Sequence, residues 1–213
     1  MSLSQQAYQS IKRKIVYLEL EPGAVIDEVA LQEELRLGRT PIREALQRLE
    51  QEKLVTIVPR RGMFVSEISV TDLYQIFELR LTVEALAARL AARRGSEAHW
   101  QQMATALNSI PWDSANDQQL IEIDEACHAI IYTAADNTFL EDMLTTCYAL
   151  SLRLWMFFLH RIGDMRTAVQ EHQQIYTALR DGDADEAARL MQQHIQSFQA
   201  EMSAIMIGEW DHG

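Results

Sequence analysis

The sequence predicts a mostly α-helical protein with two domains. Between residues 27 and 65, two helical segments precede two short β runs, and from about residue 70 to residue 210 the apolar pattern is helical throughout. A chain of 213 residues with 48% hydrophobic content can form two modest cores. We therefore predict a winged helix-turn-helix over residues 1–67 and an all-helical bundle over residues 70–210.

The helix pair of the first domain is predicted from capping and periodicity. Residues 27–35 form a short amphipathic segment, and a second helix is expected to begin near residues 38–41. Pro41 suits the first turn of that helix because it has no N–H to donate and a fixed φ. An apolar stripe at helical spacing follows, formed by Ala45, Leu46 and Leu49.

Two short strands after the helix pair predict the wing. Residues 55–58 are a β-branched run, residues 59–62 read Pro-Arg-Arg-Gly, and residues 63–65 form the return strand. Gly62 stands where a positive φ is expected. Arg60 and Arg61 are thus predicted at the tip of the wing.

The second helix carries a polar face that suits DNA. Arg39 and Arg43 are four residues apart and therefore share a face with Thr40 and Gln47. An arginine in the major groove can donate two hydrogen bonds to the O6 and N7 atoms of guanine. Charged faces of small helices are often only solvated. The fixed order of helix pair, helix with Pro41 and basic wing favours binding to double-stranded DNA.

This segment resembles the N-terminal domain of the GntR family of bacterial transcription regulators. The family usually reads Leu-Gly-Val-Ser-Arg-Thr-Pro-Val-Arg-Glu-Ala-Leu, where residues 35–46 here read LRLGRTPIREAL. Arg36 replaces the usual glycine, and Gly38 replaces the usual serine. Glycine caps a helix less well than serine, by a few tenths of a kcal/mol. The DNA-binding residues expected from the helix pair, the wing and this resemblance are Arg36, Arg39, Thr40, Arg43, Arg60, Arg61 and Gly62.

Charge and composition bear on partners and compartment. The net charge of −12 divides into +1 for residues 1–66 and −13 for the remainder, so an acidic second domain would be held away from the phosphates. The sequence shows neither an apolar run near twenty residues nor a basic-then-apolar leader, which predicts a cytoplasmic protein without a membrane segment. Cys127 and Cys147 are expected to be reduced core thiols.

Six helices are expected in the second domain, separated by clusters of turn-forming residues. Their predicted ranges are 72–94, 97–108, 117–134, 138–160, 165–180 and 184–207.

One constellation in these helices suits a metal ion. Asp124 and His128 are spaced i, i+4 and therefore share one helix face. His172 and His194 each lie eleven residues from residue 183 in the turn between two helices, so an antiparallel hairpin would bring them to the same height. Three imidazoles and a carboxylate suit a divalent transition metal: zinc, nickel, manganese or iron. A single histidine in a bundle is more often a satisfied core or surface group.

This region resembles the FCD ligand-binding domain of the FadR-type branch of the family. The resemblance implies that Asp124, His128, His172 and His194 bind a metal at the floor of an effector pocket. Zinc or nickel is expected before manganese or iron. His99, His160 and His212 have no matching placement.

The effector is expected to be a small carboxylate, which needs a cation to bind it. Arg80 lies among apolar residues of the first bundle helix, where the resemblance implies an arginine that faces the pocket. An ion pair with Glu84 is an equal alternative for Arg80. Arg153 is a second candidate for the effector carboxylate.

These observations predict a one-component transcription repressor rather than an enzyme. A homodimer would read a pseudo-palindromic operator, and the effector would control that binding. One alternative is a metalloenzyme that acts on a small organic acid through the same four residues. Another is a metal with a purely structural role.

Overall fold

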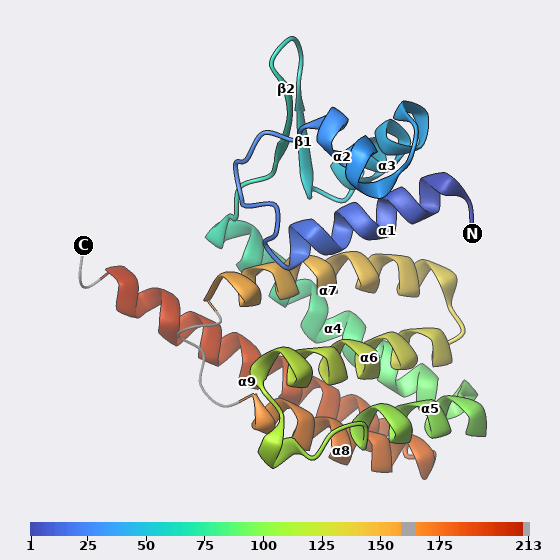
Figure 1. Cartoon of the computed structure of the whole chain (residues 1–213). Helices are drawn as coiled ribbons and strands as arrows, with labels where there is room; N and C mark the ends of the chain where they lie inside the picture. Colours follow the sequence, from blue (N-terminus) through green and yellow to red (C-terminus); the bar gives the residue numbers. More distant parts are fainter. Residues whose placement is uncertain (159–164, 211–213) are drawn as a thin grey trace. The chain divides into compact units, whose positions relative to one another are not determined.

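The computed structural model describes residues 1–158 and 165–210 (Figure 1). Two compact units are distinguished: Met1–Leu73 with Ala149–Phe157, and Tyr74–Tyr148 with Phe158–Gly213. His160 and His212, and the predicted end of a helix at residue 160, lie outside the described residues.

The first unit contains three helices and a two-stranded antiparallel sheet. The helices are α1 (Leu3–Val16), α2 (Glu28–Leu35) and α3 (Arg39–Gln51), and the strands are β1 (Val55–Val58) and β2 (Gly62–Val65). The register pairs Val55 with Val65 and Val58 with Gly62, which leaves a short turn at the tip of the hairpin. The predicted winged helix-turn-helix is therefore confirmed.

The core of this unit forms where α3 packs on α1 and α2. Ala45, Leu46 and Leu49 are fully buried, as the stripe predicts. Helix α1 was not among the predicted elements, although its buried Ile11 and Ile15 lie four residues apart, the spacing that marks one helix face.

Helix caps and positive-φ positions account for several residues in the turns of this unit. The Asp27 carboxylate caps α2 by accepting from the backbone N–H groups of Val29 and Ala30, whereas Gly38 caps α3 without a side-chain hydrogen bond. Arg36 ends α2 at φ 53°, ψ 40°, a left-handed conformation that costs a non-glycine residue about 1–2 kcal/mol. Gly62 has φ 113°, which confirms the positive φ predicted there.

The second unit is helical, as predicted. Its helices are α4 (Val70–Arg94), α5 (Glu97–Leu107), α6 (Asp117–Ala134), α7 (Thr138–Phe158), α8 (Arg166–Arg180) and α9 (Ala184–Trp210), of which α4 and α7 also contribute residues to the first unit. The described ends lie within about three residues of the predicted ones. A short 3₁₀ turn, Trp112–Ser114, follows Pro111 and was not predicted.

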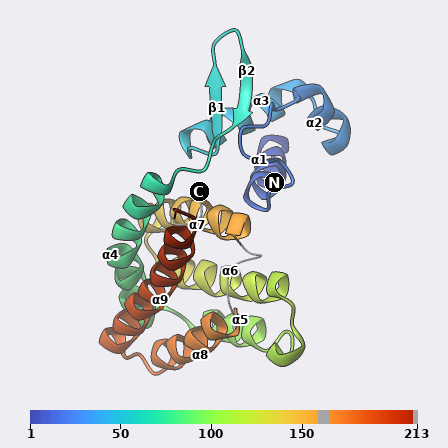
Figure 2. The same cartoon turned by 90° about the vertical axis from the view of Figure 1, so that its left-hand side faces the viewer.

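Helices α8 and α9 form an antiparallel hairpin and lie side by side in both views (Figures 1 and 2). Gly182 in the turn has φ 73°, and the N–H groups of Gly182 and Asp183 donate to the carbonyls of Leu179 and Ala178 at 3.2 and 3.0 Å. This closed turn satisfies the last carbonyls of α8 and reverses the chain. It thereby places His172 opposite His194.

Among the described residues, none of the helices combines the length and apolar character that crossing a membrane requires. Cys127 and Cys147 are both buried, and neither is part of a disulfide, as expected of reduced core residues. Burial raises the pKa of the Cys127 thiol well above its ordinary value, so this group stays a neutral packing residue.

Candidate metal centre and DNA-binding face

Four buried side chains meet inside the helical unit. Asp124 and His128 come from α6, His172 from α8 and His194 from α9, and one ligand atom from each lies within 4.8 Å of all the others. Each residue is at most 5% exposed. The spacing seen in the sequence therefore corresponds to a real cluster in the fold.

In each imidazole, the Nδ1 atom faces a hydrogen-bond acceptor. The partner of His128 is Glu84 Oε2 at 3.2 Å, that of His194 is Glu171 Oε2 at 2.7 Å, and that of His172 is the Ala168 carbonyl at 3.0 Å. An Nδ1–H that donates to such an acceptor leaves the lone pair on Nε2. All three histidines are thus held in the tautomer that can offer Nε2 to a metal.

Two polar atoms of the cluster lack a hydrogen-bond partner among the described residues. They are Asp124 Oδ1 and His172 Nε2, and both are buried. Leaving buried acceptors unsatisfied is costly, and native structures keep few of them without a reason. A cation bound by three imidazole nitrogens and one carboxylate would satisfy both atoms, so the residues fit a divalent transition metal.

The protonation states also suit a metal. Burial, reinforced by the neighbouring His194, lowers the pKa of His172 to about 3, which keeps this imidazole neutral. Burial alone would raise the pKa of Asp124, but the surrounding histidines hold it below its ordinary value. A deprotonated carboxylate and a neutral imidazole are the forms that bind metal ions.

A second layer of residues holds the cluster in place. The Tyr148 hydroxyl donates to Asp124 Oδ2 at 2.7 Å, and the Tyr132 hydroxyl donates to Glu84 Oε1 at 2.6 Å. The sequence analysis missed Glu171 and both tyrosines. Tyr132 could have been found, because it lies four residues after His128 and therefore shares its helix face.

Arg80 lies in this second layer and is 3% exposed. Its Nε and Nη2 atoms donate to Glu84 Oε1 at 2.9 and 2.8 Å. Burial alone would raise the pKa of Glu84, but His128 and Arg80 hold it well below its ordinary range. Arg80 therefore makes the ion pair that the sequence left open as an alternative, and its pairing with an effector stays a prediction.

Arg153 belongs to the first unit, whereas the four clustered residues belong to the second. It donates to the backbone carbonyl of Ser66, and burial lowers its pKa to about 10. No described contact joins Arg153 to the four clustered residues, and its binding to the effector carboxylate stays a prediction.

The predicted DNA-binding residues of α3 and the wing are exposed. Arg39, Thr40 and Arg43 lie on the side of α3 opposite its buried stripe, and Arg60 and Arg61 lie at the tip of the wing beside Gly62. Arg36 is exposed at the end of α2. Arg43 also makes an ion pair with Glu28 across the helix pair, at 2.7 Å.

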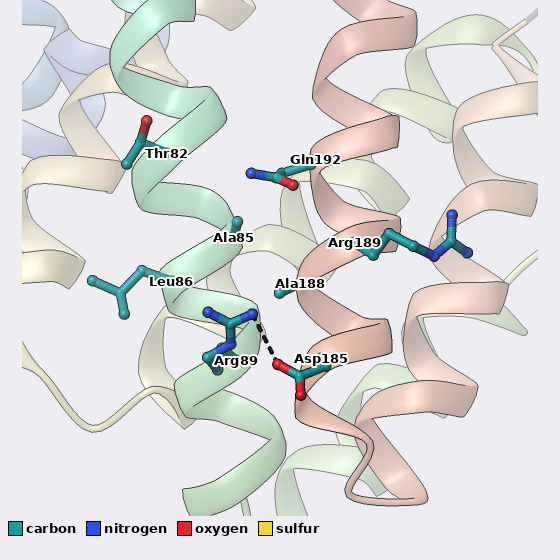
Figure 3. A pocket seen from close by; sticks show the side chains of 8 residues that line it. All are labelled: Thr82, Ala85, Leu86, Arg89, Asp185, Ala188, Arg189 and Gln192. Atoms are coloured by element: carbon teal, nitrogen blue, oxygen red, sulfur yellow. Dashed lines mark ion pairs between the residues drawn. The ribbon is translucent and has the colours of Figure 1, made fainter.

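A separate groove of about 400 Å³ lies between α4 and α9 (Figure 3). The ion pair of Arg89 with Asp185, at 2.9 Å, bridges the two helices there. None of the four clustered residues lines this groove. Its lining residues are Thr82, Ala85, Leu86, Arg89, Asp185, Ala188, Arg189 and Gln192.

Known proteins resemble the chain along most of its length. The HTH-type transcriptional repressor RspR of Escherichia coli K12 is 26% identical over 196 residues, which cover 91% of this chain and 86% of that protein. The HTH-type transcriptional repressor GlaR of the same organism is 29% identical, covering 90% and 92%. The Nta operon transcriptional regulator of Aminobacter aminovorans is 29% identical, covering 85% of each chain.

The solved structure of Escherichia coli McbR/YncC has the same fold, with a TM-score of 0.85 at 20% identity, covering 97% of this chain and 99% of that one. The family model of bacterial regulatory proteins of the gntR family matches residues 3–65, and that of the FCD domain matches residues 75–197. These matches span both units and explain the DNA-binding fold. The chain therefore belongs to the GntR family of bacterial transcription regulators, in the branch that carries an FCD domain.

Proposed function

We propose that this protein is a repressor whose operator binding is controlled by a small carboxylate bound at a metal-containing pocket in the helical unit. The observation that carries the proposal is the convergence of Asp124 with three histidines whose Nδ1 atoms all face acceptors. Zinc or nickel is proposed first, with manganese or iron as alternatives, because imidazole nitrogens dominate the donor set.

Each residue of the pocket has a distinct proposed task. Asp124 and the Nε2 atoms of the three histidines would hold the metal, while Glu84, Glu171 and the Ala168 carbonyl orient the imidazoles. When bound, the metal would supply positive charge and open coordination positions for a carboxylate oxygen. Glu84 accepts from the Nε and Nη2 atoms of Arg80, so the end of the guanidinium that carries Nη1 is the part proposed to pair with the effector.

Repression and operator symmetry are proposed from the relatives and from the fold. Two of the relatives are named repressors. A single winged helix reads few base pairs, and helix-turn-helix proteins commonly pair two half-sites by two-fold symmetry. We therefore propose a homodimer on a pseudo-palindromic operator, without an enzymatic role.

A titration of operator binding tests the proposal. With a labelled operator selected from random DNA, fluorescence anisotropy should show that at least one of a panel of small mono- and dicarboxylates changes the affinity of metal-loaded protein by about 5- to 150-fold. Metal-stripped protein should not respond to the same compound, because the pocket would lack its cation. A carboxylate that is turned over would favour the metalloenzyme, and an unchanged response after stripping would favour a structural metal.

The surface proposed for the second copy is the exposed side of α4. Leu79 and Leu86 are 40% and 43% exposed and lie seven residues apart on one helix face, and Leu86 also lines the groove of Figure 3. Glu78 lies near one leucine and Arg89 near the other. An antiparallel pair of α4 helices would bring Leu79 to Leu86 of the partner and Glu78 close to Arg89, a self-complementary arrangement.

We expect Leu86→Glu to weaken dimerisation by about 100-fold or more, because a two-fold interface loses the leucine contact twice and gains two buried charges. Sedimentation equilibrium measures the dissociation constant. Phe139→Glu is the matched control, since Phe139 is 88% exposed on α7. Dissociation by the Phe139 variant alone would place the interface elsewhere.

A further inference from the structure

The ion pair between Glu28 and Arg43 joins the two helices of the DNA-binding unit. Glu28 is the first residue of α2, and Arg43 lies in the second turn of α3. Glu28 Oε2 accepts from Arg43 Nε at 2.7 Å, and Glu28 Oε1 accepts from Nη2 at 3.2 Å. The carboxylate therefore binds the side of the guanidinium that carries Nε and Nη2, through two roughly parallel hydrogen bonds.

The geometry decides which donors of Arg43 stay available. A guanidinium has five N–H groups in a rigid fork, and Glu28 takes the Nε–H and one Nη2–H. The end of the fork, with one N–H on Nη1 and one on Nη2, is not used by Glu28. These two parallel donors are the pair that can bind the O6 and N7 atoms of guanine. Glu28 thus leaves the base-reading edge of Arg43 open.

The exposure of the two side chains agrees with a positioning contact. The Arg43 side chain is 46% exposed and that of Glu28 only 23%, so the carboxylate lies behind an arginine that faces solvent. The Arg43 guanidinium holds the pKa of Glu28 below its ordinary value, which keeps the carboxylate charged. Arg39 makes no hydrogen bond or ion pair with the part of the chain that the structure describes, so its fork is not held in this way.

We infer that Glu28 is a specificity-determining positioning residue that presents the end of the Arg43 guanidinium to one base pair of the operator. This inference rests on the proposed base contact of Arg43. A free arginine side chain loses rotamer freedom when it binds a base, and a side chain already held in place loses less. Glu28 also brings a negative charge toward the phosphates, so it should improve selectivity while slightly opposing non-specific binding.

The test compares specific with non-specific binding of the full-length protein by anisotropy and by selection from randomised operator positions. Glu28→Gln should lower the ratio of specific to non-specific affinity by about 3- to 10-fold. It should also relax preference at the base pair contacted by Arg43 and leave other positions unchanged. Glu28→Asp keeps the charge but is one methylene shorter, so it should relax the same position. Glu33→Gln removes an exposed carboxylate from the same helix and should do neither.

A double-mutant cycle separates the two proposals. In the Arg43→Ala background, Glu28→Gln should have no further effect on base preference, because the residue through which it acts is gone. An equal effect of Glu28→Gln in both backgrounds would overturn the role of Glu28. The same holds if Arg43→Ala relaxes the base preference but Glu28→Gln does not; in both cases the base contact of Arg43 would stand. If Arg43→Ala itself leaves base preference intact, the base contact of Arg43 is wrong, and the inference fails with it.

Discussion

His172→Ala is expected to abolish stoichiometric metal binding and to lower the melting temperature of the helical unit by about 10 °C. A ligand that binds only the folded state stabilises it by about 4 kcal/mol at a thousand times its dissociation constant. For a protein of this size, each kcal/mol shifts the melting temperature by about 2–4 °C. The metal would join α6, α8 and α9, so its loss removes a cross-link between separate helices.

Elemental analysis and calorimetry of metal-replete and chelator-treated protein measure both effects. In wild-type protein, chelation should cause most of the fall in melting temperature, whereas in the His172 variant it should cause almost none. His99→Ala is the control, because His99 lies on α5 outside the four-residue cluster, where it accepts from the Ser96 N–H at 3.1 Å. The metal site is refuted if metal-replete wild-type protein contains no stoichiometric transition metal, or if the His172 and His99 variants behave alike.

Arg43→Ala is expected to weaken specific operator binding by about 1–3 kcal/mol, because a bidentate contact to a base is lost. Non-specific binding should change little, since phosphate contacts supply it. The measurement is anisotropy on the selected operator, on operators altered at single positions and on unrelated DNA.

Wing variants provide the comparison for this result. Arg60→Ala and Arg61→Ala should weaken binding to all DNA and give a shallower slope of log affinity against log salt concentration, because each removes a phosphate contact. Arg43→Ala should instead alter base preference. Unchanged operator affinity and unchanged preference in the Arg43 variant would mean that the assigned face of α3 does not read bases.

Local structure was predictable from the sequence wherever neighbours along the chain decide it. Pro41 marks the first turn of α3, Gly62 the positive φ of the wing, and residues 181–183 the turn of the α8–α9 hairpin. Each depends on backbone preferences that a single residue carries. Helix α1 was missed, although Ser2 caps its first turn by accepting from the Gln5 N–H and two basic residues, Arg13 and Lys14, lie in its last turn.

The four-residue cluster was predictable for a related reason. Asp124 and His128 are neighbours through helical periodicity, and the symmetry of a hairpin places His172 opposite His194. What periodicity cannot supply is the distance between the two pairs. The packing of α6 on α8 brings His128 and His172 together, with ring centroids 4.9 Å apart.

The sequence by itself thus determined the wing, the order of the helices from α2 onward and the identity of the clustered residues. Only the tertiary structure decided the partners of these residues: Glu84 lies 44 positions from His128, and Glu28 lies 15 positions from Arg43. Helical spacing predicts neighbours three or four positions away on one helix. Contacts between helices depend instead on how whole faces pack, because burying apolar surface determines which helix faces, and therefore which polar groups, come together.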